Sequence, residues 1–190
     1  MNKIALVLIA IVLVSSAALS QGTMAKSGQW GIQTSLGVAS SPPSAPQGFP
    51  SNTSVGMKFW ASDNMAVRVS VGFASVSPPS VAGQTSNSAS SYSFGAGFEY
   101  HMDSKGGNVS PYVGLAAGYG GISTSGATNL PSLIEVTGFV GGEYFFSSNF
   151  SWAGQVGLGF VSESNSGGTT SSGSAFGTSS ATMIASWYLN

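Results

Sequence analysis

The chain has 190 residues, of which only 6% are Asp, Glu, Lys or Arg, whereas soluble globular domains have roughly 25%. Its net charge of −1, without basic runs, provides no electrostatic basis for binding nucleic acid. The absence of cysteine excludes disulfides, thiolate zinc sites and a lipidated cysteine. This composition suits a single domain whose exterior largely faces something other than water.

The first twenty residues have the pattern of a secretory signal peptide. Lys3 precedes an apolar run over residues 4–14, and Ala18 and Ser20 are small residues at the −3 and −1 positions before Gln21. The alternative is a membrane anchor, but the run is shorter than the roughly 20 residues of a spanning helix. We therefore expect a cleavable signal peptide over residues 1–20, followed by a single domain over residues 21–190.

After this segment, apolar and small residues alternate with a period of two, which is typical of β-strands with two different faces. The alternation predicts eight strands, at residues 29–38, 52–61, 65–75, 91–102, 109–120, 133–146, 150–161 and 179–189. These segments are longer than the 5–6 residues typical of soluble strands, and they reach the roughly 9–11 residues with which a tilted strand crosses a bilayer.

The connections between these strands alternate in length. Long Ser/Gly/Pro-rich connections lie at residues 39–51, 76–90, 121–132 and 162–178, and short ones at residues 62–64, 103–108 and 147–149. The strands therefore run up and down as an antiparallel meander. All of the long connections lie at one end of it, and all of the short connections lie at the other.

The composition of the two faces indicates which of them points inward. One face carries only apolar residues, such as Val67, Val69 and Val71, while the other is mostly Gly, Ser and Ala with a few charges. A soluble barrel would need Lys, Glu, Thr and Gln on its outer face, whereas small residues suit the crowded interior of a narrow eight-stranded barrel. Because lipid offers no hydrogen-bond partners, every backbone group in the membrane must pair within the protein, and the sheet must therefore close into a barrel. We interpret the chain as all-β: an eight-stranded antiparallel up-and-down transmembrane β-barrel, with a soluble barrel or sandwich as the alternative.

Aromatic residues of the apolar face gather near the short connections. This set predicts a girdle at one membrane interface, and it consists of Tyr100, Tyr144, Phe146, Phe150, Trp152 and Trp187.

The signal peptide, the strand count, the loop alternation and the facing together resemble the eight-stranded outer-membrane barrels of the OmpA/OmpX type, within the opacity-protein-like surface antigens. The resemblance extends from about residue 29 to the end of the chain. It implies that the short turns face the periplasm and the long loops face the exterior. Two features differ from the family pattern: the chain ends on Asn190 instead of Phe, and no peptidoglycan-binding domain follows.

The charged residues of the strands share the inward face, and they are Lys58, Arg68, Glu99, Glu135 and Glu143, together with His101. Lys58, Arg68, Glu99 and Glu143 each lie four residues from a short connection, which is roughly 13 Å along the strand at about 3.3 Å per residue. Because buried charges need partners, these four are expected to form a luminal charge network. It acts either as a static polar core or, as the resemblance suggests, as a gate.

The sequence contains no convincing catalytic, cofactor or metal site. The only histidine, His101, lies next to a short connection, away from the outer leaflet, and we expect it to hydrogen-bond locally. The carboxylates match the cations better than a metal, and no phosphate-binding loop is present. We therefore expect neither enzymatic activity nor a cofactor.

Two functions remain open at this stage. The first is a monomeric protein of the cell outer membrane with a structural or surface-interaction role, in which the long loops serve adhesion, recognition of an extracellular or host ligand, or envelope integrity. The second is a narrow porin-like channel for ions or small solutes, gated or plugged by the charge network. Eight strands leave a lumen that side chains just fill, which favours the first.

Overall fold

The structure is a computed structural model, and it describes residues 27–37, 53–76, 88–102, 107–124, 130–166 and 172–189. The predicted signal peptide, residues 1–20, and much of each predicted long loop lie outside the described residues.

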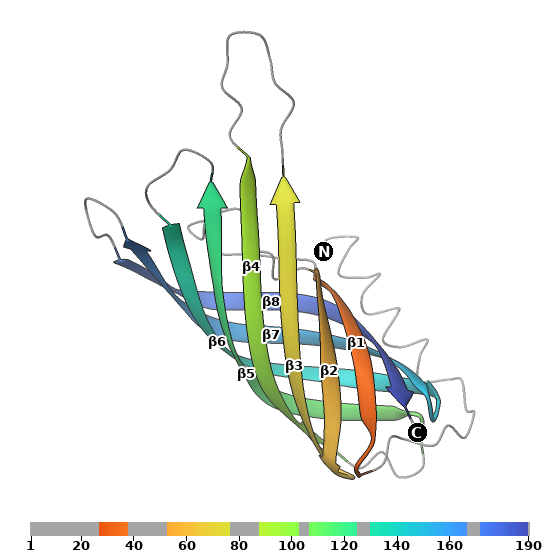
Figure 1. Cartoon of the computed structure of the whole chain (residues 1–190). Helices are drawn as coiled ribbons and strands as arrows, with labels where there is room; N and C mark the ends of the chain where they lie inside the picture. Colours follow the sequence, from red (N-terminus) through yellow and green to blue (C-terminus); the bar gives the residue numbers. More distant parts are fainter. Residues whose placement is uncertain are drawn as a thin grey trace, which may run out of the picture.

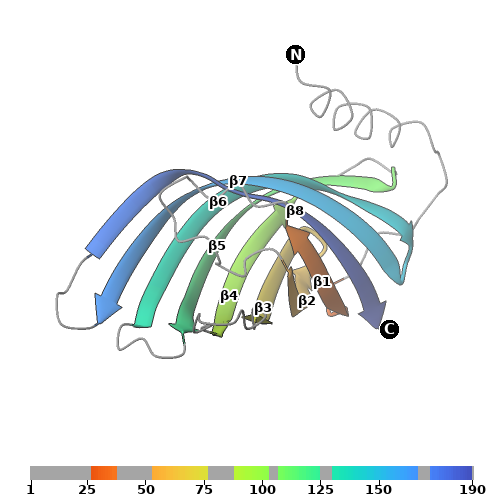
Figure 2. The same cartoon turned by 90° about the horizontal axis from the view of Figure 1, so that it is seen from above.

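The described residues form eight strands that close into one antiparallel barrel, in which β1 pairs with β8. The strands are β1 (Trp30–Gly37), β2 (Thr53–Ser62), β3 (Met65–Val76), β4 (Ala89–His101), β5 (Val109–Thr124), β6 (Leu130–Ser147), β7 (Phe150–Ser166) and β8 (Ser172–Leu189). They follow one another around the wall in chain order (Figures 1 and 2). The predicted all-β, up-and-down, eight-stranded barrel is therefore confirmed.

Both ends of the barrel can be named from its connections. The short-turn end is where the β2–β3, β4–β5 and β6–β7 connections lie, and the opposite end is called the loop end. The tight turns hold the register of the hairpins. Residues 63 and 64 separate β2 from β3, where Lys58 pairs with Arg68, and residues 148 and 149 separate β6 from β7, where Glu143 pairs with Ala153.

The outward face of the barrel is apolar, as the alternation predicted. Val69, in the middle of β3, has half of its surface exposed, and Val67 and Val71 on either side are similarly exposed. Within the described strands, every Asp, Glu, Lys and Arg lies at an inward position. Exposing this apolar surface to water would cost about 25 cal/mol per Å², whereas exposing it to lipid has no such cost. The exterior therefore fits a membrane environment.

Outward aromatic residues form belts near both ends of the barrel. At the short-turn end the rings of Phe146, Phe150 and Trp187 contact one another in sequence, with centroids 5.5 and 5.3 Å apart. Towards the loop end, Tyr92 packs beside Tyr119 with centroids 6.4 Å apart.

The distance between the belts is of the same order as the height of the apolar band in known membrane barrels. Tyr92 and Tyr100 are eight residues apart on β4, which is roughly 26 Å of strand at 3.3 Å per residue and about 20 Å along the barrel axis at a tilt of about 40°. The apolar band of known membrane barrels is about 25 Å tall. Among the described residues, no helix has the length and apolar character needed to cross a membrane.

The strands reach further towards the loop end than the alternation predicted. β8 begins at Ser172 rather than at residue 179, β7 continues to Ser166 instead of ending at residue 161, and β6 begins at Leu130. Part of the predicted long loop over residues 162–178 is therefore strand, which corrects that prediction. The added residues are mostly Ser, Gly and Thr, so that backbone pairing forms these strand ends without any alternation of side chains.

Candidate functional site

The charged residues of the lumen meet close to the short-turn end. The ammonium of Lys58 lies 2.6 Å from Glu99 Oε2 and 2.7 Å from Glu143 Oε2, and all three residues are buried. On the loop side of this group, Arg68 Nη1 donates to Glu99 Oε1 at 2.8 Å. The structure therefore brings together the four residues proposed as a luminal charge network, from strands β2, β3, β4 and β6.

Neutral side chains complete the bonding of the four charges. Glu143 Oε1 accepts hydrogen bonds from the hydroxyls of Ser151 and of Tyr188, the latter at 2.6 Å. Gln155 Oε1 accepts from Arg68 Nη1 at 2.9 Å. Strands β7 and β8 thereby join the network, so bonds across the lumen link most of the barrel wall.

His101 also belongs to this network. Its Nε2 lies 3.0 Å from Glu99 Oε2, and its Nδ1 lies 3.0 Å from the hydroxyl of Ser110. A neutral imidazole that donates from Nε2 to Glu99 and accepts at Nδ1 from Ser110 satisfies both contacts. The sequence predicted only a local role for this residue, whereas its ring also lies between the rings of Trp60 and Tyr112, with centroids 4.4 and 5.0 Å away.

Apart from His101, the network holds two cations and two carboxylates, so their formal charges cancel. Desolvating several ions costs several kcal/mol per ion, which only close pairing and complete hydrogen bonding offset. Both requirements are met for Glu99 and Glu143, each of which has three polar partners among the residues above. The arrangement is a compact, saturated ionic layer.

Apolar residues seal the ionic layer on both sides. Towards the short-turn end lies a buried cluster of Trp60, Ala66, Phe145 and Tyr188. Towards the loop end lies a second buried cluster of Tyr112, Phe139, Ala153 and Ile184. We call these two clusters and the ionic layer between them the plug.

The two cations contact the aromatic rings of the plug directly. Lys58 Nζ lies 4.8 Å from the ring centre of Trp60, and the guanidinium carbon of Arg68 lies 4.4 Å from that of Phe139. Cation–π contacts of desolvated groups contribute about 2 kcal/mol each. The apolar and ionic layers are therefore bound to one another.

The aromatic residues of the plug correct the predicted interior. The inward face was expected to hold mostly Gly, Ser and Ala with a few charges, yet Trp60, Tyr112 and Tyr188 also point inward and are buried. The sequence contains a usable sign of this, since Trp60 lies two residues from Lys58 and therefore shares its face.

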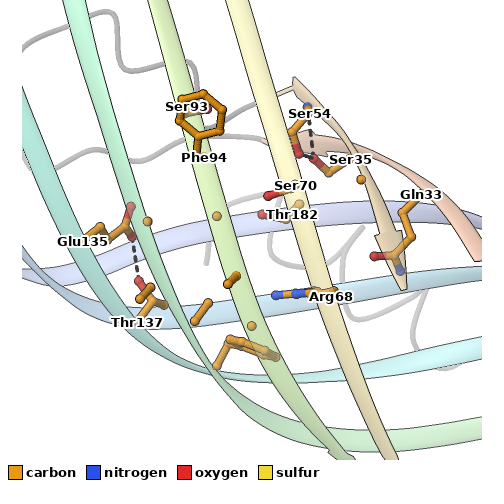
Figure 3. A pocket seen from close by; sticks show the side chains of 18 of the residues that line it. Gln33, Ser35, Ser54, Arg68, Ser70, Ser93, Phe94, Glu135, Thr137 and Thr182 are labelled. Carbon is orange, nitrogen blue, oxygen red and sulfur yellow. Dashed lines mark hydrogen bonds between the residues drawn. The ribbon is translucent and has the colours of Figure 1, made fainter. Parts of the chain in front are cut away.

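Beyond the plug, the lumen widens into a cavity of about 170 Å³. Arg68 and Phe139 line it on the plug side, and its walls carry hydroxyl, amide and glycine positions from all eight strands. Glu135 also lines the cavity and bonds to Thr137 (Figure 3). The lumen is therefore open space in one half and closed by the plug in the other.

The geometry alone would allow a metal ion at one point of the plug. Ligand atoms of Glu99, His101 and Glu143 lie within 4.8 Å of one another. The ammonium of Lys58, however, already contacts both carboxylates. A cation from the chain itself therefore occupies the position that a metal would take.

The packing of the plug predicts a contrast between two glycines of β5. A Cβ added at Gly114 would collide with the ring of Phe139 and with the carbonyl oxygen of Phe98, whereas one added at Gly118 meets nothing nearer than 3.6 Å. We expect Gly114→Ala to lower the free energy of unfolding by about 1–3 kcal/mol, as overpacked cores do. Gly118→Ala is the matched control and should change it by less than about 1 kcal/mol. Urea unfolding in lipid vesicles measures both, and equal effects would contradict the packing described.

A closed barrel with an apolar, aromatic-belted exterior, whose described strands carry charged residues only on the inward face, defines a transmembrane β-barrel protein. Among solved structures, the outer membrane protein OprG from Pseudomonas aeruginosa is similar, with 12% sequence identity, a TM-score of 0.51 and coverage of 90% of this chain and 99% of OprG. The N-terminal β-barrel domain of Pseudomonas aeruginosa OprF has 13% identity, a TM-score of 0.46 and coverage of 86% and 98%. No family model and no curated protein matches the sequence. The likeness to OprG shows the fold, and the predicted resemblance to eight-stranded outer-membrane barrels is confirmed at that level.

Proposed function

We propose that this protein is a monomeric barrel of the outer membrane, exported by its signal peptide, with a structural or surface-interaction role. The plug is the observation that supports this proposal. A lumen closed by one ionic and two apolar layers is a rigid support for the long connections at the loop end. Those connections are rich in Ser, Gly, Thr and Pro, and we propose that they contact an extracellular or host ligand or support the envelope.

The second candidate, a gated channel, has less support from the plug. Opening would require the buried ion pairs of Lys58 to separate, together with the pair that Arg68 forms at the cavity floor, and the rings of Trp60 and Phe145 would still block the lumen. Breaking one buried pair costs about 3–5 kcal/mol, because it leaves an uncompensated charge. A static polar core is therefore the better account of the network. We likewise expect no enzymatic activity.

Single-channel recording of the full-length protein in planar bilayers tests this proposal. We expect no resolved conductance from the natural protein, and none from Arg68→Ala, because the two apolar layers do not depend on Arg68 for their closure. Phe139→Ala is a second variant, which removes the aromatic ring that lines the cavity at the plug and leaves the short-turn layer in place. Stable openings of the natural protein, or a large conductance that appears with Arg68→Ala, would favour a gated channel.

A further inference from the structure

Glu135 differs in its surroundings from Glu99 and Glu143, the two carboxylates of the plug. It is half-buried on β6, and its Oε1 accepts a hydrogen bond from Thr137 Oγ1 at 2.6 Å. Among the described residues it takes part in no ion pair within 4.0 Å. Its neighbour across the ladder on β5 is Gly118, which has no side chain, so the space beside the carboxylate is open.

Within the part of the chain that the structure describes, no basic residue pairs with this carboxylate. Its basic residues are Lys3, Lys26, Lys58, Arg68 and Lys105. Two of them are bound to Glu99 and Glu143 in the plug, two precede the described residues, and Lys105 belongs to the β4–β5 connection at the short-turn end. The connections of the loop end, residues 38–52, 77–87, 125–129 and 167–171, contain no charged residue. Among the described residues, no cation is therefore left to pair with Glu135.

The side chains that line the cavity favour an ammonium group over a calcium ion. A half-buried carboxylate between low-dielectric walls attracts positive charge. Calcium takes six to eight oxygen ligands, usually with several carboxylates, whereas among the described residues Glu135 alone brings a carboxylate to the lining of this cavity. An ammonium group has three N–H donors, which suit one carboxylate and neighbouring hydroxyls.

The other walls of the cavity add hydroxyls and a second charge. Ser35, Ser54, Ser70 and Thr182 line the cavity with Arg68 (Figure 3). The positive Arg68, which Figure 3 shows well apart from Glu135, disfavours a second cationic group in the ligand. The cavity volume of about 170 Å³ leaves room for a small organic body beside the ammonium group.

We propose that this cavity is a binding site for a small polar molecule with one ammonium group, which Glu135 binds and Thr137 helps to position. The plug forms the floor of the site, so that ligands enter from the loop end. The site does not require the lumen to conduct, and it goes beyond the structural role proposed above.

Titration of the full-length protein in detergent micelles with ethanolamine hydrochloride tests this site, with ¹H–¹⁵N NMR as the readout. We expect saturable shifts of amides around the cavity, such as that of Gly118, with a dissociation constant on the order of millimolar. Ethylene glycol, which has the same size but no charge, should produce no saturable shift. Glu135→Gln should weaken the binding of ethanolamine about tenfold, which corresponds to about 1.4 kcal/mol.

Two further variants separate a specific site from a general negative field. Glu163→Gln removes a charge from a half-buried inward position of β7 that does not line the cavity, and it should weaken binding clearly less than Glu135→Gln does. Thr137→Val keeps all charges but removes the hydrogen bond to Glu135, and it should weaken binding by a few-fold. Heat-modifiable migration on gels checks that each variant folds.

Unchanged affinity in Glu135→Gln, an equal loss in Glu163→Gln, or equal binding of ethylene glycol would overturn the proposed site. None of these results bears on whether the lumen conducts. A failure of this inference is therefore distinguishable from a failure of the proposed structural role.

Discussion

Lys58→Met should lower the free energy of unfolding by about 3–5 kcal/mol, the usual effect of removing one partner from a buried ion pair. The ammonium of Lys58 is the contact that Glu99 and Glu143 share. Without it, two buried carboxylates would face each other in a region closed to water. The four tryptophans of the chain make urea unfolding from lipid vesicles measurable by fluorescence.

A double variant separates charge imbalance from lost packing. Lys58→Met combined with Glu143→Gln restores neutrality, since Arg68 and Glu99 remain as a pair. We expect this variant to recover most of the lost stability. An unfolding midpoint of Lys58→Met equal to that of the natural protein would show that the ion pairs contribute nothing. A double variant no more stable than Lys58→Met would assign the loss to packing.

Val69→Lys should lower the free energy of unfolding in vesicles by about 2–4 kcal/mol, the cost of a lysine on the lipid face near the bilayer midplane. Val69 lies midway along β3, between Met65 near the short turn and Phe73 towards the loop end, and half of its surface is exposed on the outside.

Ser70→Lys is the matched control, because Ser70 is the next residue of the same strand and lines the cavity. The lysine can extend into the open half of the lumen, so we expect a loss of less than about 1 kcal/mol. Equal losses in the two variants would contradict the separation of a lipid-facing apolar side from a polar lumen. The comparison therefore tests whether the two faces of β3 lie in different environments.

The number of strands, and which face of each strand points outward, could be predicted from the sequence. Side chains that alternate with a period of two leave few other arrangements once one face is entirely apolar. Counting from the tight turns also placed Lys58, Arg68, Glu99 and Glu143 at one height. This works for Lys58, Arg68 and Glu143 because a two-residue turn fixes the register of both of its strands, and for Glu99 because the β4–β5 connection is also short. The structure brings these four together with their nearest atoms 2.6–2.8 Å apart.

The contacts across the lumen could not be predicted in the same way. Which inward side chains meet depends on the stagger and tilt of the closed barrel, and these involve all eight strands at once. The place of His101 between Trp60 and Tyr112 is one such contact. The division of the lumen into a plug and a cavity is another, because it depends on how far each large side chain reaches.

The strand ends were missed for a different reason. In residues 172–178 of β8, apolar and polar side chains do not alternate. Backbone hydrogen bonds to β7 hold these residues in the sheet. Pattern analysis detects strands through side chains, so a strand made largely of Ser, Gly and Thr is not distinguished from a loop.

The labelling rates of two single cysteines test the central claim, that the lumen is open at the loop end and sealed by the plug. The chain has no cysteine of its own, so each variant carries one thiol. Ser70→Cys lies in the cavity, and Ala153→Cys, at another inward position, lies in the plug with 4% of its surface exposed. In protein folded into vesicles, a small water-soluble thiol reagent should label Ser70→Cys rapidly and Ala153→Cys only after unfolding. Equal rates of labelling in the folded protein would contradict the account.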